Sequence, residues 1–141
     1  MAATIHLLGA ADAAVLDRVA DDVFDDAIRP GALREFLARP DHHLAVAVEA
    51  GVVVGFASAV DYVHPDKPRE LWINEVGVAG PYRQRGLAKA LLQALFVKAR
   101  ALHCAEAWVL TERGNDAALG LYRSLGGEQM PDDTVGFTFC L

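Results

Sequence analysis

The feature that most constrains this chain is a segment that passes from an apolar strand pattern through a basic loop into a helix. Its residues are Val76, Gly77, Val78, Ala79, Gly80, Pro81, Tyr82, Arg83, Gln84, Arg85, Gly86, Leu87 and Ala88. The first N–H groups of a helix have no intrahelical partner and carry a partial positive charge, so an anion bound there gains several hydrogen bonds. Gly86 lets the main chain approach a ligand, and Arg83 and Arg85 add charges that bind phosphate. The segment predicts a pyrophosphate site.

Other phosphate-binding motifs do not fit this chain. A dinucleotide fingerprint needs three glycines in the order G-x-G-x-x-G, and a P-loop needs G-x-x-x-x-G-K-[ST]. The sequence contains neither pattern. The remaining alternative is that Gly86 and its two arginines form an ordinary solvated helix start, and the second half of the chain bears on that choice.

A second motif follows the short apolar run of residues 105–110. Asn115 and Asp116 are good helix N-caps, and Gly126 with Gly127 ends the helix. Between them, apolar and aromatic residues recur at three- and four-residue steps on one helix face: Ala118, Leu121, Tyr122 and Leu125. A tyrosine hydroxyl on such a face can reach a ligand atom between two strands, although Tyr122 can also be an ordinary core residue.

Together the two segments resemble the GNAT N-acetyltransferases. Arg83, Gly86 and Ala88 fit the acetyl-CoA signature Gln/Arg-x-x-Gly-x-Gly/Ala. The second GNAT element, Asn-x-x-Ala-x-x-Leu-Tyr-x-x-x-Gly, is matched at every place by Asn115, Ala118, Leu121, Tyr122 and Gly126.

The resemblance covers roughly the C-terminal half of the chain and implies acetyl-CoA as the cofactor. Tyr122 would protonate the departing CoA thiolate, and Asn115 would hydrogen-bond the pantetheine arm. The implied cofactor-binding residues are Val76, Gly77, Val78, Arg83, Gln84, Arg85, Gly86, Leu87, Ala88, Asn115, Ala118 and Tyr122.

The length of 141 residues predicts one domain, residues 1–141, of mixed α/β class. Hydrophobic patterning predicts strands at residues 5–8, 43–49, 52–62, 71–78, 105–110 and 134–140, and helices at residues 12–24, from residue 30, at 87–102 and after residue 115. A tight hairpin is expected at Ala50-Gly51.

The GNAT resemblance implies a central, mostly antiparallel sheet flanked by about four helices, with a parallel strand pair that splays apart. The pantetheine arm would pair with Val76, Gly77 and Val78 in the gap. A β-bulge at Gly77 is expected to open the splay.

Glu75 is the candidate general base. An ammonium group must lose a proton before it attacks a thioester, and this carboxylate stands on an otherwise apolar strand beside the expected cofactor channel. Burial of an unpaired carboxylate is costly, which indicates a task or a partner. The alternative is a structural ion pair with Arg69, Arg113 or another basic group.

Composition narrows the class of partner. The chain is 53% hydrophobic and 23% charged, which indicates a globular protein, and no apolar run approaches the ~20 residues of a membrane-spanning helix. The first residues lack a signal-peptide pattern, so we expect a cytoplasmic location. A net charge of −6 disfavours nucleic acid and suits a cationic acceptor. A homodimer is left open.

Cysteine and histidine usage indicates neither a disulfide nor a metal site. Cys104 and Cys140 are expected to be reduced core thiols. The five histidines include no pair at the helical spacing of a zinc site.

Within the superfamily, the aminoglycoside 3-N-acetyltransferases are the group that the chain resembles. The likeness rests on the stretch 23–26, the strand 43–48, Glu75 and the acidic tail 131–135. That group usually carries Asp where this chain has Glu75. The resemblance implies that five acidic residues contact the substrate: Asp25, Asp26, Glu75, Asp132 and Asp133. The run Asp21 to Asp26 can equally be a solvated face.

These observations predict an acetyl-CoA-dependent N-acetyltransferase that acts on an amine of a polycationic small molecule. The first candidate acceptor is the 3-amine of an aminoglycoside. The alternative is another amine acceptor, such as a polyamine, an amino acid or a protein N-terminus, because enzymes for all these acceptors share the same cofactor motifs. A catalytically silent acyl-CoA-binding module is the third alternative, but such a module needs neither Glu75 nor Tyr122.

Overall fold

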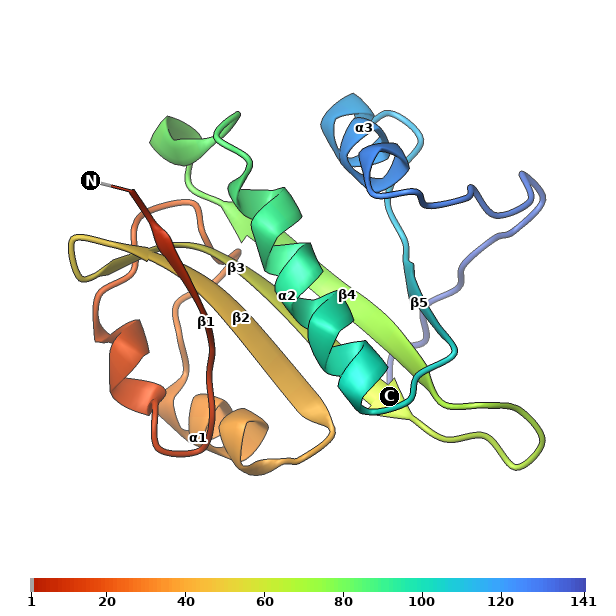
Figure 1. Cartoon of the computed structure of the whole chain (residues 1–141), viewed down its shortest axis with the longest axis horizontal. Helices are drawn as coiled ribbons and strands as arrows, with labels where there is room; N and C mark the ends of the chain where they lie inside the picture. Colours follow the sequence, from red (N-terminus) through yellow and green to blue (C-terminus); the bar gives the residue numbers. More distant parts are fainter. Residues whose placement is uncertain (1) are drawn as a thin grey trace. The chain divides into compact units, whose positions relative to one another are not determined.

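The structure is a computed structural model that describes residues 2–141. Its elements follow one another as β1 (Thr4–Leu7), η1 (Ala13–Asp17), α1 (Pro30–Ala38), β2 (His42–Glu49), β3 (Val52–Tyr62), β4 (Glu70–Val78), η2 (Gly80–Tyr82), α2 (Leu87–Ala101), β5 (Glu106–Val109) and α3 (Asp116–Ser124), where η marks a 3-10 helix (Figure 1). The chain forms two compact units, of which the first ends at Leu110 and the second is Thr111–Leu141.

The first unit contains a five-stranded sheet in the order β1-β2-β3-β4-β5. All neighbours are antiparallel except β4 and β5, which are parallel and joined through α2. The mixed α/β class is therefore confirmed, with three α-helices where about four were expected. The predicted hairpin is also present, because Ala50 and Gly51 both have positive φ angles, 51° and 75°, as a two-residue I′ turn requires.

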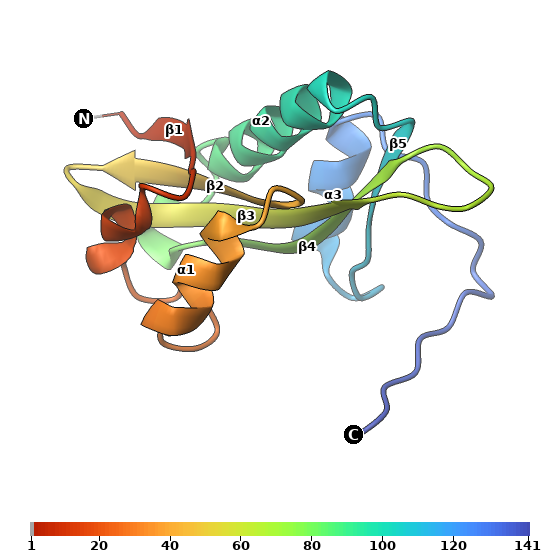
Figure 2. The same ribbon diagram turned by 90° about the horizontal axis from the view of Figure 1, so that it is seen from below.

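Helices cover both faces of this sheet (Figure 2). α2 packs on one face through the buried side chains of Leu91, Leu92, Leu95 and Ala99. On the other face, α1 and the segment around η1 enclose a second part of the core, in which Leu16, Val23 and Leu37 pack against Val46 and Phe56. The face opposite α2 carries Glu75, the candidate general base.

The expected parallel β4–β5 pair is present, and it is shorter than β4. Their pairing runs only from Glu70 opposite Glu106 to Ile73 opposite Val109, although β4 continues to Val78. β5 ends at Val109 and so accompanies only the first half of β4 (Figure 1). Residues 74–78 of β4 therefore have a neighbour, β3, on one side only.

The expected β-bulge exists but lies at Asn74, not at Gly77. Ile73 pairs with Ala59 and Glu75 pairs with Ser58, so Asn74 is the extra residue. Gly77 is required for another reason: a Cβ there would lie 2.2 Å from the carbonyl oxygen of Val23. The close approach of another chain segment, not a bulge, excludes a side chain at this position.

The predicted helix at residues 12–24 is wrong beyond its first turn. Only η1 is helical, and the following residues run extended beside β3, where Ala20 donates to the carbonyl of Val53 and Val53 donates to that of Arg18. Asp22 then takes a left-handed conformation with φ of 64°. The apolar residues are inward as expected, because sheet pairing supplies the backbone bonds that a helix would have made.

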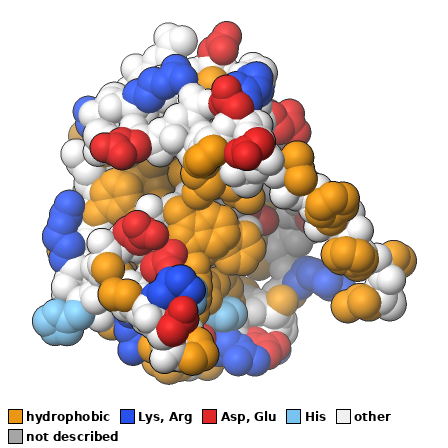
Figure 3. All heavy atoms as spheres, turned by 90° about the vertical axis from the view of Figure 1, so that its right-hand side faces the viewer, with side chains coloured by type: hydrophobic (Ala, Val, Ile, Leu, Met, Phe, Trp, Pro, Cys, Tyr) orange, Lys and Arg blue, Asp and Glu red, His pale blue; other side chains and the backbone are white. Residues whose placement is uncertain are grey.

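The second unit contains α3 with the segments before and after it. The predicted strand at residues 134–140 is wrong: this stretch has no regular structure, and its large apolar residues are exposed. Hydrophobic side chains that reach the surface on one face of the molecule are drawn in orange in Figure 3. Cys140 is exposed as well, which corrects the expectation of a core thiol, whereas Cys104 is half-buried and burial raises the pKa of its thiol. No helix in residues 2–141 is long and apolar enough to cross a membrane.

Candidate functional site

The N-terminus of α2 is open for an anion. Gly86 is the N-cap residue, has a φ of 77°, and makes no side-chain cap. The first intrahelical bond runs from Ala90 N–H to Gly86 O at 3.0 Å, so the N–H groups of residues 87–89 have no helical acceptor. A Cβ placed at Gly86 would meet no atom within 4 Å. The helix start therefore offers free donors beside open space.

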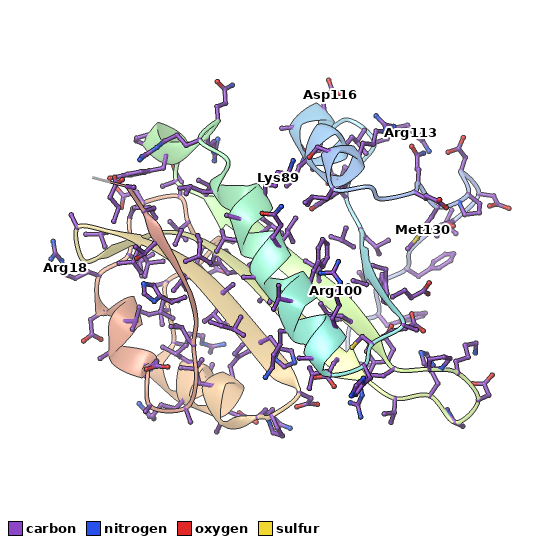
Figure 4. All side chains as sticks on the ribbon, in the orientation of Figure 1. Arg18, Lys89, Arg100, Arg113, Asp116 and Met130 are labelled. Carbon is purple, nitrogen blue, oxygen red and sulfur yellow. The ribbon has the colours of Figure 1, made fainter. Side chains whose placement is uncertain are left out.

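The charge at this helix end is the reverse of what an unliganded helix favours. The first turn of α2 contains no acidic residue, and Lys89 projects from it (Figure 4). A cation near a helix N-terminus opposes the helix dipole unless an anion lies between them. Lys89 forms no ion pair with the described residues. Sequence reasoning missed this residue, although its place one position after the Arg-x-x-Gly-x-Ala motif could have identified it.

The two arginines of the loop differ in their surroundings. Arg83 donates through Nε to the carbonyl of Val78 at 3.0 Å, which ties the loop to the end of β4. Arg85 donates to Glu49 Oε1 at 2.8 Å, and its guanidinium lies 5.3 Å from the ring centre of Tyr82. That hydrogen bond lowers the pKa of the Glu49 carboxyl. Arg85 is thus already paired, and Arg83 and Lys89 carry the charge that is available to a ligand.

The backbone of residues 76–78 lies beyond the end of the β4–β5 pairing. Since β5 ends opposite Ile73, the outward N–H and C=O groups of this stretch have no strand partner among residues 2–110. An extended ligand can pair with such an edge as an added strand would. The stretch leads directly into Ala79, which donates to the carbonyl of Val54 at 2.9 Å, and then into the basic loop.

Glu75 lies on the sheet face opposite α2. It pairs with Ser58, which is on the face of Phe56, whereas a Cβ at Gly55 would contact Leu91 of α2. Its side chain is exposed, which corrects the expectation of a buried carboxylate. The alternative of a structural pair also receives no support, since Arg69 pairs with Asp61 and Arg113 with Asp132. Glu75 is an accessible, unpaired carboxylate within the described chain.

Asp25 and Asp26 belong to the segment that crosses this same face. Phe24 stacks on Phe56 with 3.9 Å between ring centres, and the Val23 carbonyl lies against Gly77. Both aspartates are exposed and directly follow these contacts. The structure thus brings the acidic segment to the end of β4 that carries Glu75.

The second motif forms α3 as expected. Asn115 is its N-cap, and its Oδ1 accepts a hydrogen bond from Ala118 N–H at 3.1 Å, while its amide NH₂ forms no hydrogen bond with the described residues and can donate to a ligand. Gly127 donates to the carbonyl of Tyr122 at 3.0 Å and closes the helix. Tyr122 is half-buried, and burial raises the pKa of its phenol. The hydroxyl therefore keeps its proton well above neutral pH.

Asp132 and Asp133 lie in the exposed chain after α3. Asp132 already accepts from Arg113 at 3.3 Å and from Gln129 at 3.1 Å, whereas Asp133 forms no ion pair with any described residue. Over residues 2–141 no group of three or more His, Cys, Asp or Glu side chains could hold a metal ion.

Comparison with known proteins gives one family. The model of the acetyltransferase (GNAT) family matches residues 13–126. The chain is 33% identical over 129 residues to N-alpha-acetyltransferase RimI of Mycobacterium tuberculosis, and the alignment covers 90% of this chain and 79% of that protein.

Solved structures share the fold at lower identity. An aminoglycoside acetyltransferase from an uncultured soil metagenomic sample, in complex with sisomicin, has a TM-score of 0.82 and 20% identity over 99% of this chain and 96% of its own. The aminoglycoside N-acetyltransferase AAC(6′)-Iy in complex with CoA has a TM-score of 0.75 and 21% identity over 98% of this chain and 95% of its own.

Proposed function

The chain belongs to the GNAT family of acetyltransferases, and on that premise we propose that it acetylates an amine of a polycationic small molecule, with an aminoglycoside as the first candidate. The observation that carries the proposal is that α2 begins with free N–H donors and basic side chains, while β4, the preceding strand, carries the exposed carboxylate of Glu75.

Acetyl-CoA is the acetyl donor in this family, and the residues present fit it. The free N–H groups of residues 87–89, together with Arg83 and Lys89, suit a pyrophosphate, and the open edge of residues 76–78 suits the amides of a pantetheine arm. Gln84, Leu87 and Ala88 complete the loop, and the Asn115 amide is a further donor in the proposal.

The chain's own residues supply the proton transfers. Acetyl-CoA contributes an acetyl group activated as a thioester. In our proposal Glu75 removes a proton from the acceptor ammonium, directly or through water, so that the free amine can attack. Tyr122 donates its hydroxyl proton to the departing thiolate, a role that its raised pKa suits because the phenol stays protonated at neutral pH.

The acceptor assignment rests on charge. Glu75, Asp25 and Asp26 are exposed carboxylates at one end of the sheet, and the chain carries a net charge of −6. Such a cluster attracts a ligand with several ammonium groups. Asp132 and Asp133 are proposed to bind distal ammonium groups of the same ligand. We retain the 3-amine as the proposed position. The solved structure AAC(6′)-Iy has 6′ in its name, and identifying the acetylated amine by NMR distinguishes the two positions.

A second candidate is the α-amine of a peptide or an amino acid. The observation that favours it is the 33% identity to an N-alpha-acetyltransferase, which exceeds the 20% identity to the aminoglycoside enzyme. An α-amine acceptor would use Glu75 in the same way but would not need the distal carboxylates. The family match spans both units, which supports the proposal that residues 1–141 act as one domain.

The test combines a transfer assay with a binding assay. The purified protein and acetyl-CoA are offered kanamycin, gentamicin, spermidine, free amino acids and an alanine-starting peptide, and the acetylated position is identified by NMR. Transfer to an aminoglycoside supports the first candidate, and transfer to the peptide alone supports the second. Absence of transfer to every amine, with intact acetyl-CoA binding, refutes the enzymatic proposal in favour of a silent binding module.

Binding is measured separately as the rise in melting temperature with acetyl-CoA concentration. Gly86→Asp places a carboxylate and a Cβ at the helix start, so we expect this rise to disappear. Gly31→Asp is the matched control, because Gly31 lies in the first turn of α1 with no atom within 4 Å of an added Cβ. An unchanged rise in Gly86→Asp contradicts the pyrophosphate assignment.

A further inference from the structure

The chain has two tryptophans, and the structure stacks them on each other. Trp72 of β4 and Trp108 of β5 are register partners in the parallel pair. Their ring centres lie 5.6 Å apart with 17° between the ring planes, and both side chains are half-buried. Two adjacent indoles therefore form a partly exposed aromatic surface on neighbouring strands of the first unit.

One indole is fixed and the other is free. Trp108 donates through Nε1 to the hydroxyl oxygen of Tyr62 on β3. Trp72 forms no hydrogen bond with any described residue, and its Nε1 is not among the buried atoms that lack a partner. Trp108 thus holds the stack in place, while Trp72 retains an N–H donor that a ligand can use.

The bulge at Asn74 places this aromatic surface next to Glu75. In a regular strand, residues 72 and 75 point to opposite faces. Here Trp72 pairs with Val60 and Glu75 pairs with Ser58, two β3 residues that share a face. The inserted residue therefore makes Trp72 and Glu75 consecutive side chains on the face opposite α2, the same face that Val23 and the acidic segment approach.

We propose that Trp72, backed by Trp108, binds the face of a cationic ring in the acceptor while Glu75 receives the ring's ammonium group. This inference rests on the proposed acetyltransfer and specifies its substrate class: a saturated ring that bears amines, in preference to an acyclic polyamine. Trp72 is then a specificity-determining residue.

The chemistry of the surface matches that ligand. An indole face attracts a nearby cation and at the same time covers the apolar face of a ring. The exposed carboxylate of Glu75 follows Trp72 on this face, and the exposed Asp25 and Asp26 belong to the segment that crosses the same face, so the electrostatic field also favours an ammonium. Glu70, on the other side of Trp72 along β4, is already paired with His64. A flexible chain of methylenes offers no flat surface to stack and loses more conformational freedom on binding.

Equilibrium binding tests the proposal without catalysis. Because both tryptophans of the chain belong to the pair, tryptophan emission, excited selectively over tyrosine, reports on this surface alone. We expect kanamycin, in the absence of acetyl-CoA, to change the emission in a saturable way, and spermidine at the same charge concentration to change it little. No saturable change with kanamycin, or an equal change with spermidine, overturns the proposal.

Substitutions then separate a binding role from a packing role. Trp72→Leu should raise the KM for kanamycin about tenfold, which corresponds to about 1.4 kcal/mol, with little change in kcat or in the KM for acetyl-CoA. Trp72→Phe keeps an aromatic face and should restore most of the lost affinity. Val97→Ala, at a surface position of α2 that is 65% exposed, is the control and should leave all three constants unchanged.

Failure of this inference differs from failure of the proposed function. Transfer with the same kanamycin KM in Trp72→Leu and in the wild type overturns the aromatic site while the enzyme class stands. Absence of any transfer refutes the function, and the fluorescence titration of the wild type then still decides whether the surface binds a cationic ring. If Trp72→Leu does not fold, the comparison of Trp72→Phe with the wild type carries the same decision, since a lower affinity is expected from the smaller ring.

Discussion

Replacing Gly77 with alanine tests how tightly the acidic segment is held against β4. A Cβ at this position would lie 2.2 Å from the Val23 carbonyl oxygen and 2.9 Å from Cε1 of Phe56. The first of these atoms belongs to the backbone, so it cannot move away by a side-chain rotation. The alanine must instead displace the segment that leads to Asp25 and Asp26, or displace β4 itself.

The size of the effect follows from two opposing contributions. Inserting a methyl group into a packed site costs ~1–3 kcal/mol, and a backbone overlap places the cost at the upper end. Loss of glycine entropy in the unfolded chain offsets roughly 0.4–1 kcal/mol. We therefore expect Gly77→Ala to lower the free energy of unfolding by about 2 kcal/mol, or the melting temperature by roughly 7 °C for a chain of this length.

Two other glycines of the same stretch serve as controls. At Gly80 no atom lies within 4 Å of an added Cβ and φ is not positive, so alanine should be neutral or slightly stabilising. Gly86 also has open space, but its φ of 77° is left-handed, and alanine there should cost about 1 kcal/mol from backbone strain alone. Thermal unfolding of the three variants measures the order Gly77, Gly86, Gly80. A Gly77→Ala protein as stable as Gly80→Ala would refute the proposed contact with Val23.

Three further predictions concern the chemistry. Tyr122→Phe should bind acetyl-CoA normally while kcat falls roughly 10²-fold. Because burial raises the pKa of this phenol, the alkaline fall in wild-type activity should begin only above the ordinary tyrosine pKa of about 10. Equal turnover in the two proteins would return Tyr122 to a packing role. Glu75→Gln should reduce turnover and flatten the low-pH limb of the rate profile, since the titrating base is gone, and a rate profile identical to that of the wild type would contradict its role. Asp132→Asn combined with Asp133→Asn should raise the acceptor KM and weaken its salt dependence with a smaller effect on kcat, and an unchanged KM would remove both residues from the acceptor site.

Features with a local physical cause could be predicted from the sequence. The Ala50-Gly51 turn, the Gly86 helix start and the Asn115 cap each depend on the conformational preferences of one or two residues and on donors a few positions away. The strands and helices with strong periodicity also lie where they were expected, to within one or two residues at their ends. Local preference sufficed there because nothing distant competes with it.

The exceptions arise where a distant segment supplies the backbone partners. Residues 18–20 follow a helical pattern of apolar residues but pair with Val53, and the alternating residues 134–140 form no strand because no strand pairs with them in the second unit. Hydrophobic periodicity states which side chains are inward, but it does not state which backbone groups meet.

The family and the cofactor were determined by the sequence, because backbone donors, glycine conformations and caps act over a few neighbouring residues. The surroundings of the catalytic candidates were decided by the tertiary structure alone. The pairing of Arg85 with Glu49 and the stacking of Trp72 on Trp108 join segments that are distant in the sequence. The exposure of Glu75 likewise depends on how the segments around β4 pack. The position of the bulge depends on the register with β3, and a shift by one residue turns a side chain to the other face of the sheet. That register is a property of two paired strands, and neither strand's sequence contains it.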